Sequence, residues 1–253
     1  MDGAKSSTRP EIVFFDVGDT LLRVDPSWEA VYLRACREHG LRLDQADVER
    51  AFRQAIREGF WDEEGPFETT MEASYRRVQG FDQRMMALLG HADLPDAFYR
   101  RVADLFVAAD AWHVFPETRP VLQALAGAGV RLAVISNWVW GLPELLHELD
   151  LARHFEAIVV SARVGYQKPQ PEIFRHALDV TRADPARAVH VGDNPAADVR
   201  GAQAVGIRPI LIDRRDRIGS GNIADQGLTG VALIRRLDEL LPLVGLGALA
   251  RVG

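Results

Sequence analysis

The feature that most constrains the fold is a series of short apolar runs separated by segments with helical periodicity. The first run, Ile12–Phe15, is apolar throughout and ends at Asp16. Beyond Pro116, similar runs follow at 130–135, 157–160, 188–191 and 209–212. Short apolar strands that alternate with helices indicate a parallel sheet with helices on both faces. We therefore predict an α/β protein built on a doubly wound parallel sheet.

A long segment after the first run has a different pattern. No strand signal occurs from about Pro26 to His113, whereas Val48, Phe52 and Ile56 recur at helical spacing. We predict a flexible tail at 1–10, a core at 11–22 and 114–253, and a smaller all-helical cap domain at 23–113. Within the core, 231–241 is predicted as a final helix.

Composition excludes several classes of partner. The chain has 253 residues, is 47% hydrophobic and carries a formal net charge of -6. Its densest basic cluster is Arg214, Arg215 and Arg217, which Asp213 and Asp216 interrupt, and we interpret this cluster as a solvated loop. An acidic chain without a basic stripe is a poor ligand for nucleic acid or an anionic membrane.

The cysteine content and the hydropathy suggest a compartment. Cys36 is the only cysteine, so no intramolecular disulfide can form, which fits a reducing environment. No apolar stretch approaches the length of a membrane span, and the first ten residues lack the apolar run of a secretory signal. We predict a cytoplasmic protein, monomeric or homodimeric.

Polar residues stand where predicted strands end. Asp16, Ser136 and Asp193 each follow an apolar run. In open parallel sheets, the ligand crevice lies beyond the carboxyl ends of the strands, so these side chains should meet there. A carboxylate such as Asp16 can attack phosphorus and form an aspartyl-phosphate. Asp16 and Asp193 together offer oxygen ligands suited to Mg²⁺.

Two further residues complete this chemistry. Lys168 precedes Pro169 in a polar loop, and its ammonium can neutralise both a nucleophile and phosphoryl oxygens. The Ser136 hydroxyl and neighbouring N–H groups can cradle a phosphate oxygen. Taken singly, each residue equally fits an ordinary role as a turn aspartate, a surface lysine or a helix-capping serine. Their joint order is what points to a site.

With these residues in place, the chain resembles the haloacid dehalogenase-like (HAD) hydrolase superfamily, whose members have a Rossmann-like core. The resemblance spans about residues 11 to 242 and is specific for the superfamily, but not for a substrate. It rests on four ordered segments: Phe15–Leu21, Val134–Asn137, Gly165–Pro169 and Val191–Gly201.

The resemblance implies roles for the acidic residues. Asp16 would be the nucleophile. Asp16, the backbone carbonyl of Gly18 and Asp193 would bind Mg²⁺, and Asp198 and Asn194 would support that site or Lys168.

The resemblance also implies a phosphate site. Thr20, Ser136 and Lys168 would hold the phosphate of a small phosphorylated substrate or position the nucleophile, and Asn137 would help at the phosphate or its approach. Trp138 and Trp140 come just after Asn137 and are candidates for bordering the crevice. Four aromatic residues before the core are candidates for the entrance or for the interior of the cap: Trp61, Phe67, Tyr75 and Trp112.

One departure from the family pattern bears on mechanism. Family phosphatases usually carry a second Asp two positions after the nucleophile, where this chain has Gly18, with Asp19 one place later. A positioned general acid/base is typically worth about 10²–10⁴-fold in rate. The sequence therefore predicts a preference for aryl or acyl over alkyl phosphates, and a gain on alkyl phosphates when Asp is restored at position 18. Asp19 either replaces the missing group or serves only the turn.

Three alternative functions remain open at this point. A 2-haloacid dehalogenase also lacks the second Asp and needs no metal, although that family typically has Tyr at the position of Gly18. A non-catalytic HAD-fold binding protein would explain the missing acid/base. A phosphotransferase or mutase would pass the phosphoryl group to an acceptor other than water.

Overall fold

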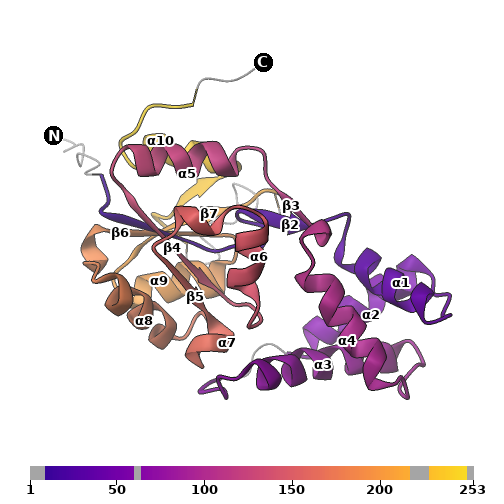
Figure 1. Ribbon diagram of the computed structural model, residues 1–253. Helices are drawn as coiled ribbons and strands as arrows, with labels where there is room; N and C mark the ends of the chain where they lie inside the picture. The colour runs from indigo at the N-terminus through magenta and orange to yellow at the C-terminus, as the bar shows by residue number, and fades with distance from the viewer. Residues whose placement is uncertain (1–8, 60–63, 217–227, 250–253) are drawn as a thin grey trace.

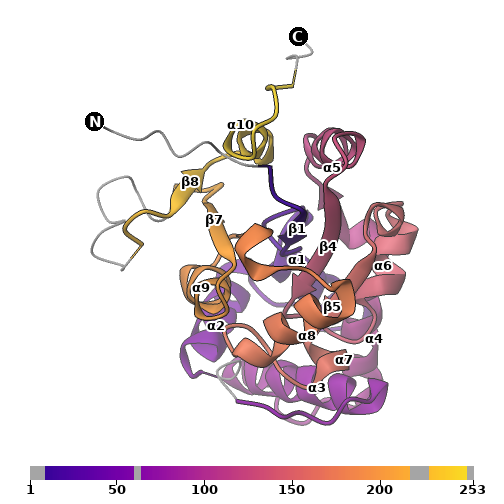
Figure 2. The same ribbon diagram turned by 90° about the vertical axis from the view of Figure 1, so that its left-hand side faces the viewer.

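The sheet of the core is parallel throughout and confirms the predicted fold class. The computed structural model describes residues 9–59, 64–216 and 228–249. Six strands pair in the order β5-β4-β1-β6-β7-β8 (Figures 1 and 2). Their bounds are Ile12–Phe15 for β1, Arg131–Ser136 for β4, Ala157–Val160 for β5, Ala188–Gly192 for β6, Arg208–Ile212 for β7 and Ala232–Ile234 for β8.

Helices cover both faces of this sheet because successive strand residues point to opposite faces. Ile12 and Phe14 pack against α8 and α9, whereas Val13 and Phe15 pack on the other face, where α5, α6 and α10 lie (Figure 1). These helices are α5 (Thr118–Gly127), α6 (Leu142–Glu148), α8 (Pro171–Thr181), α9 (Gly201–Ala204) and α10 (Leu240–Leu243). A short α7 (Ser161–Val164) follows β5, and single helical turns lie at 109–111, 152–154, 185–187, 195–200 and 237–239.

The last part of the core differs from the prediction. Residues 231–241 are not one helix: β8 pairs in parallel with β7, Ile210 facing Ala232, and helical structure begins only at Leu237. A short apolar run fits a helix or a strand equally well by periodicity alone. Here the open edge of β7 decides the outcome, because pairing with it satisfies the backbone of 232–234.

A two-stranded antiparallel sheet joins the core to the helical insert. β2 (Leu22–Val24) pairs with β3 (Trp112–Val114) (Figure 1). The prediction that no strand lies between about Pro26 and His113 is therefore wrong for Trp112 and His113. Three-residue strands are too short to show a period, and their pairing joins positions about ninety residues apart in sequence, which no local pattern reveals.

Between β2 and β3, the described residues of the insert form helices and no strand. Its helices are α1 (Trp28–Glu38), α2 (Gln45–Arg57), α3 (Met71–Leu88) and α4 (Asp96–Val107). Three of them begin at a capping side chain, as where the Ala30 N–H donates to Ser27 Oγ. Cys36 is buried on α1 as a packing residue, and Trp112 is buried beside the cap, whereas Trp61 lies outside the described residues. Nowhere in the described parts of the chain is a helix both long enough and apolar enough to cross a bilayer.

The carboxyl group of Asp82 is buried inside the cap. Asp82 on α3 is 1% exposed, and Tyr32 donates a hydrogen bond to its Oδ1 at 2.6 Å. Among the described residues, neither Asp82 Oδ2 nor the Tyr99 hydroxyl has a hydrogen-bond partner. Burial raises the pKa of Asp82 to about 7, and the Tyr32 hydrogen bond offsets only part of that rise.

This buried carboxyl makes stability depend on pH. An unfolded Asp82 loses its proton near its ordinary pKa of 3.8, whereas the folded one keeps it until about pH 7. The free energy of unfolding should therefore fall between those limits, by at most about 1.4 kcal/mol per pH unit. We expect Asp82→Asn to remove this contribution, so that its stability relative to wild type rises from pH 5 to pH 8 in urea unfolding. The exposed Asp104→Asn on α4 is the control, and an equal difference at both pH values would contradict the assignment.

Candidate active site

The strand order brings the predicted site residues to one edge of the sheet. β1 lies in the middle, with β4 on one side leading to β5 and β6 on the other leading to β7. A crevice forms at such a switch point, beyond the carboxyl ends of the strands. Asp16 follows β1, Ser136 ends β4, and Asp193 follows β6. The topology thus accounts for the meeting of three residues that lie far apart in sequence.

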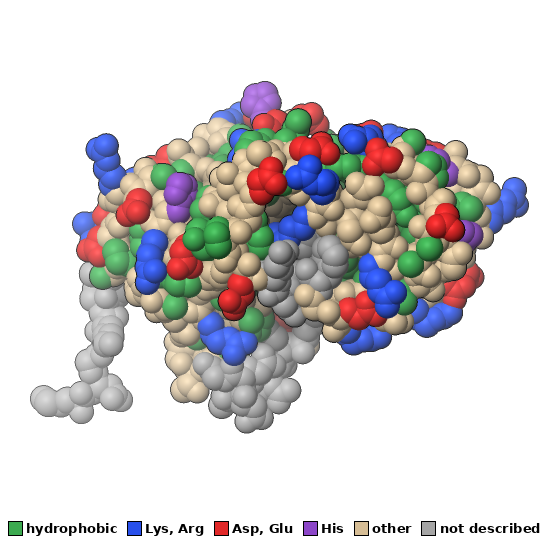
Figure 3. Space-filling view, turned by 90° about the horizontal axis from the view of Figure 1, so that it is seen from below, with side chains coloured by type: hydrophobic (Ala, Val, Ile, Leu, Met, Phe, Trp, Pro, Cys, Tyr) green, Lys and Arg blue, Asp and Glu red, His purple; other side chains and the backbone are tan. Residues whose placement is uncertain are grey.

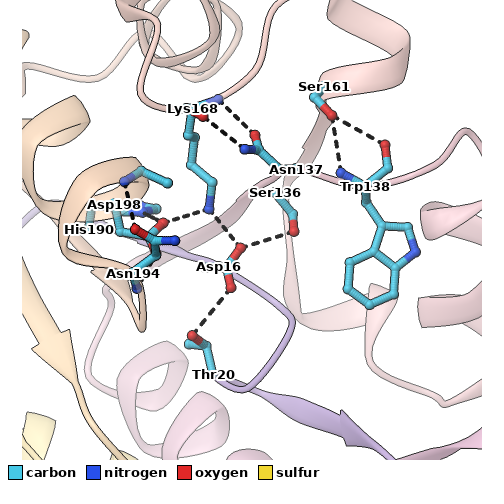
Figure 4. A network of polar contacts seen from close by, with 11 residues as sticks. Asp16, Thr20, Ser136, Asn137, Trp138, Ser161, Lys168, His190, Asn194 and Asp198 are labelled. Carbon is cyan, nitrogen blue, oxygen red and sulfur yellow. Dashed lines mark hydrogen bonds and ion pairs between the residues drawn. The ribbon is translucent and has the colours of Figure 1, made fainter. Parts of the chain in front are cut away.

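The centre of the site is a buried lysine between two carboxylates. Lys168 Nζ lies 2.7 Å from Asp16 Oδ1 and 2.6 Å from Asp198 Oδ1 (Figure 4). All three side chains are at least nine-tenths buried. A surface lysine is therefore excluded as the interpretation of Lys168, because its ammonium is withdrawn from solvent and held by ion pairs.

The electrostatics of this trio are uneven. Burial disfavours the charged form of Lys168, but the two carboxylates outweigh it and raise the pKa of the ammonium. The pKa of Asp198 is lowered despite burial, because Lys168 and His190 both face it. The pKa of Asp16 is raised, chiefly by burial, with the charge of Asp198 adding to the effect. The single positive charge of Lys168 thus neutralises only one of the two buried carboxylates, and the charge of Asp16 is the less well compensated.

Hydroxyl groups orient Asp16 from both sides. Ser136 Oγ donates to Oδ1 at 3.0 Å, and Thr20 Oγ1 donates to Oδ2 at 3.4 Å (Figure 4). Ser136 does not cap a helix, since α6 begins only at Leu142. Both hydroxyls are fully buried and contact the predicted nucleophile.

Asn137 supports the lysine loop. Its side-chain amide donates to the Lys168 carbonyl at 2.9 Å, and its Oδ1 accepts from the Lys168 N–H at 2.7 Å. This two-point contact fixes the backbone from which Lys168 projects. The structure thus gives Asn137 a contact to the chain itself, while its predicted contact with substrate stays a prediction.

The acidic residues form a cluster suited to a cation. Asp16, Asp193 and Asp198 each offer a carboxylate oxygen, and these oxygens lie within 4.8 Å of one another. Asp198 also accepts from Lys168 and from the Asn194 N–H, and the choice of Asp16 and Asp193 as metal ligands stays a prediction. Oxygen donors with excess negative charge suit a hard divalent ion. The carbonyl of Gly18 as a further ligand stays a prediction.

The loop after β6 is shaped around Asp198. A Cβ on Gly192 would overlap the carboxyl carbon of Asp198, so only glycine permits this close approach. Asn194 Oδ1 accepts from the N–H groups of Ala196 and Ala197 and thereby starts the helical turn that carries Asp198. Asn194 therefore supports the site through the shape of the loop.

Sequence reasoning missed His190. This residue on β6 is fully buried, and its Nε2 lies 2.9 Å from Asp198 Oδ1. The available signal was a lone imidazole within the apolar run Ala188–Val191, because a buried polar group needs a partner. His190 is therefore the first member of a chain of polar contacts that runs through Asp198 and Lys168 to Asp16.

The loop that follows the nucleophile is held from the core side. Asp19 has a φ of 52° and accepts a hydrogen bond from Arg215 at 3.0 Å, and its role as a replacement acid/base stays a prediction. Arg214 donates to the Thr20 carbonyl at 2.7 Å and to Glu117 at 2.6 Å. The prediction of a solvated loop is therefore wrong for Arg214, which is largely buried, while Arg217 lies outside the described residues.

The cap contacts the core at the loop that carries Lys168. The Phe67 N–H donates to the Gly165 carbonyl at 2.7 Å, and Arg77 donates to Gln167 at 3.0 Å. Gly165 has a φ of 87°, and a Cβ there would lie 3.0 Å from the Phe67 carbonyl oxygen. The Trp140 N–H donates to Ser74 on the cap, which places this residue at the boundary.

The molecular surface is hollowed where core and cap meet, and charged side chains of both signs lie at the edge of the hollow (Figure 3). A separate cavity of about 540 Å³ lies beside the β2–β3 sheet, lined among others by Asp19, His113 and Arg215. Asp16 and Lys168 are not among its lining residues, so this cavity is distinct from the carboxylate cluster.

Comparisons with known proteins agree with this architecture. The mouse (Mus musculus) haloacid dehalogenase-like hydrolase domain-containing protein 3 is 30% identical over 246 residues, which cover 93% of this chain and 94% of that protein. A glyceraldehyde 3-phosphate phosphatase of Methanothermobacter thermautotrophicus is 30% identical over 244 residues, covering 90% and 98%.

A solved structure shows the same fold. A HAD phosphatase from Thermococcus onnurineus superposes with a TM-score of 0.64 at 22% identity, covering 94% of this chain and 100% of that one. The family model described as haloacid dehalogenase-like hydrolase matches residues 10–206. The chain belongs to the haloacid dehalogenase-like hydrolase family.

Proposed function

We propose that this hydrolase is a Mg²⁺-dependent phosphohydrolase that acts on a small phosphorylated molecule through an aspartyl-phosphate on Asp16. The observation that carries the proposal is the buried Lys168 ammonium, held between Asp16 and Asp198 inside a cluster of carboxylates. Relatives that are named phosphatases support the same reaction class.

The chain's own residues supply binding and attack. Lys168, Ser136 and Thr20 present a cation and two hydroxyls around Asp16, and the same groups can contact the oxygens of a phosphate. The Asp16 carboxylate attacks phosphorus, the bond to the leaving oxygen breaks, and that oxygen departs with the electron pair. Water then cleaves the acyl phosphate and regenerates Asp16.

The donor set fits a divalent cation. Asp16 and Asp193 would hold it, and the negative charge that Lys168 leaves unbalanced is what such an ion offsets. When bound, Mg²⁺ would neutralise charge on the carboxylate and on the phosphate oxygens. The 2-haloacid dehalogenase alternative uses an aspartate nucleophile without metal, so this excess of carboxylates favours the phosphohydrolase.

The nucleophile can be tested directly. We expect Asp16→Asn to lower phosphate release from phenyl phosphate by at least about a thousandfold, because the variant has no carboxylate to attack phosphorus. The assay is phosphate release with and without Mg²⁺. Asp104→Asn is the matched control and should retain activity, because Asp104 is exposed on the cap helix α4. Equal activity of Asp16→Asn and wild type would sink the proposal, and chloride release from a 2-haloacid without Mg²⁺ would support the dehalogenase.

The metal site can be tested without turnover. We expect Asp193→Asn to weaken Mg²⁺ binding at least about tenfold in isothermal titration calorimetry, because it replaces a carboxylate ligand with a neutral amide. Asp104→Asn, at an exposed position on α4, should bind Mg²⁺ as wild type does. An unchanged affinity in Asp193→Asn would remove this residue from the metal site, whether or not the enzyme turns over.

A further inference from the structure

A tryptophan occupies the space into which a side chain at position 18 would project. A Cβ built on Gly18 would lie 3.3 Å from Cζ3 of Trp138, tighter than an ordinary van der Waals contact between carbons. Gly18 is the position at which the family's usual second Asp is missing. The absence of that Asp and the presence of this ring are therefore linked by geometry.

Trp138 has little freedom to move aside. Its N–H donates to Ser161 Oγ at 3.1 Å, and its carbonyl accepts from the same hydroxyl at 3.2 Å (Figure 4). Its ring centroid lies 4.8 Å from that of Trp112, which in turn packs edge-on against Trp28 at 5.6 Å. Core contacts thus hold the backbone of Trp138 in place, and the indole packs against Trp112, which is buried and in turn contacts Trp28 of the cap.

An aspartate at position 18 would meet this ring with its carboxyl group. The contact already needs a shift at the Cβ, and the charged atoms beyond it would lose water against an apolar surface. Restoring the carboxylate by one substitution is therefore not enough. The lack of a side chain at Gly18 and the position of the Trp138 ring are sterically complementary.

We propose that Trp138 is a specificity-determining residue that takes the place of the acid/base side chain and packs against the leaving group of aryl phosphate monoesters. The inference rests on the phosphohydrolase function proposed above. An aromatic leaving group offers a flat ring that packs well against indole. Trp138 thus favours aryl leaving groups, which can depart without the general acid that is missing at position 18.

The chemistry of the leaving oxygen agrees with this selection. When Asp16 attacks an aryl phosphate, the phosphorus–oxygen bond breaks and the electron pair stays on the aryl oxide. The hydroxyl of a phenol has a pKa of about 10, whereas that of water, which resembles an alkyl alcohol, has a pKa of about 15.7. The aryl oxide can therefore depart unprotonated and take its proton from solvent afterwards. The indole N–H is a hydrogen-bond donor that does not ionise, so it cannot supply the proton that an alkoxide needs.

The test is a double-mutant cycle with Gly18→Asp and Trp138→Leu, the latter keeping an apolar contact with Trp112. Phenyl, benzyl and ethyl phosphate separate ring packing from the leaving oxygen, because benzyl phosphate has the ring but an alkyl oxygen. We expect Gly18→Asp alone to give no gain in kcat/KM for ethyl phosphate, and the double variant to gain at least about tenfold over wild type. Trp138→Leu alone should lose roughly threefold to tenfold on phenyl and benzyl phosphate but not on ethyl phosphate.

Two results would overturn the inference. One is a Gly18→Asp variant that gains on ethyl phosphate as much as the double variant does. The other is a Trp138→Leu variant that loses equally on all three esters. Trp138→Phe is the conservative control and should keep the preference for aromatic esters.

A second readout does not depend on turnover. The thermal midpoints of the same four proteins should show that Gly18→Asp destabilises the chain less in the Trp138→Leu background than in wild type. Additive midpoints would refute the steric pair even in an active phosphatase. Coupled midpoints in a protein without Asp16-dependent phosphate release would instead refute the phosphohydrolase function and leave the steric pair standing.

Discussion

The ion pairs of Lys168 are the interaction on which the site depends. An ammonium and two carboxylates out of water are expensive, and the cost is offset only when geometry is good and the remaining polar atoms are satisfied. Several features of the chain serve that condition. Asn137 fixes the lysine backbone, His190 contacts Asp198 from the strand beneath, and Gly192 lets the Asp198 carboxylate approach. Buried charge of this kind is weak evidence for stability, and here its placement beside Asp16 argues for chemistry.

The fold explains why these groups meet without local pairing in sequence. Asp16, Ser136 and Asp193 follow three adjacent strands, and Lys168 comes from the loop after β5, at the same edge. That same loop receives the cap through Phe67 and Arg77. The cap is therefore hydrogen-bonded to the same loop that places Lys168 beside Asp16.

Most of the fold was predictable from the sequence because buried parallel strands leave an unmistakable apolar pattern. The failures have specific physical reasons. β8 was taken for a helix because three apolar residues carry no period, and β2 and β3 pair across the whole insert. At the site, strand-end residues such as Asp16 and Ser136 could be named in advance, since topology alone gathers them. Arg214 could not, because its contact with the Thr20 carbonyl spans 194 positions and depends on where β7 ends.

Trp138 shows why a missing residue cannot be interpreted alone. From the sequence, Gly18 is a vacancy that one substitution should fill. In the structure, a ring that Ser161 and Trp112 hold in place lies 3.3 Å from where a Cβ at position 18 would be, so a side chain there requires the ring to shift. A decayed catalytic position would be expected to leave its neighbours unconstrained. The packing of the indole against this position instead argues that the loop has been rebuilt around a different leaving group.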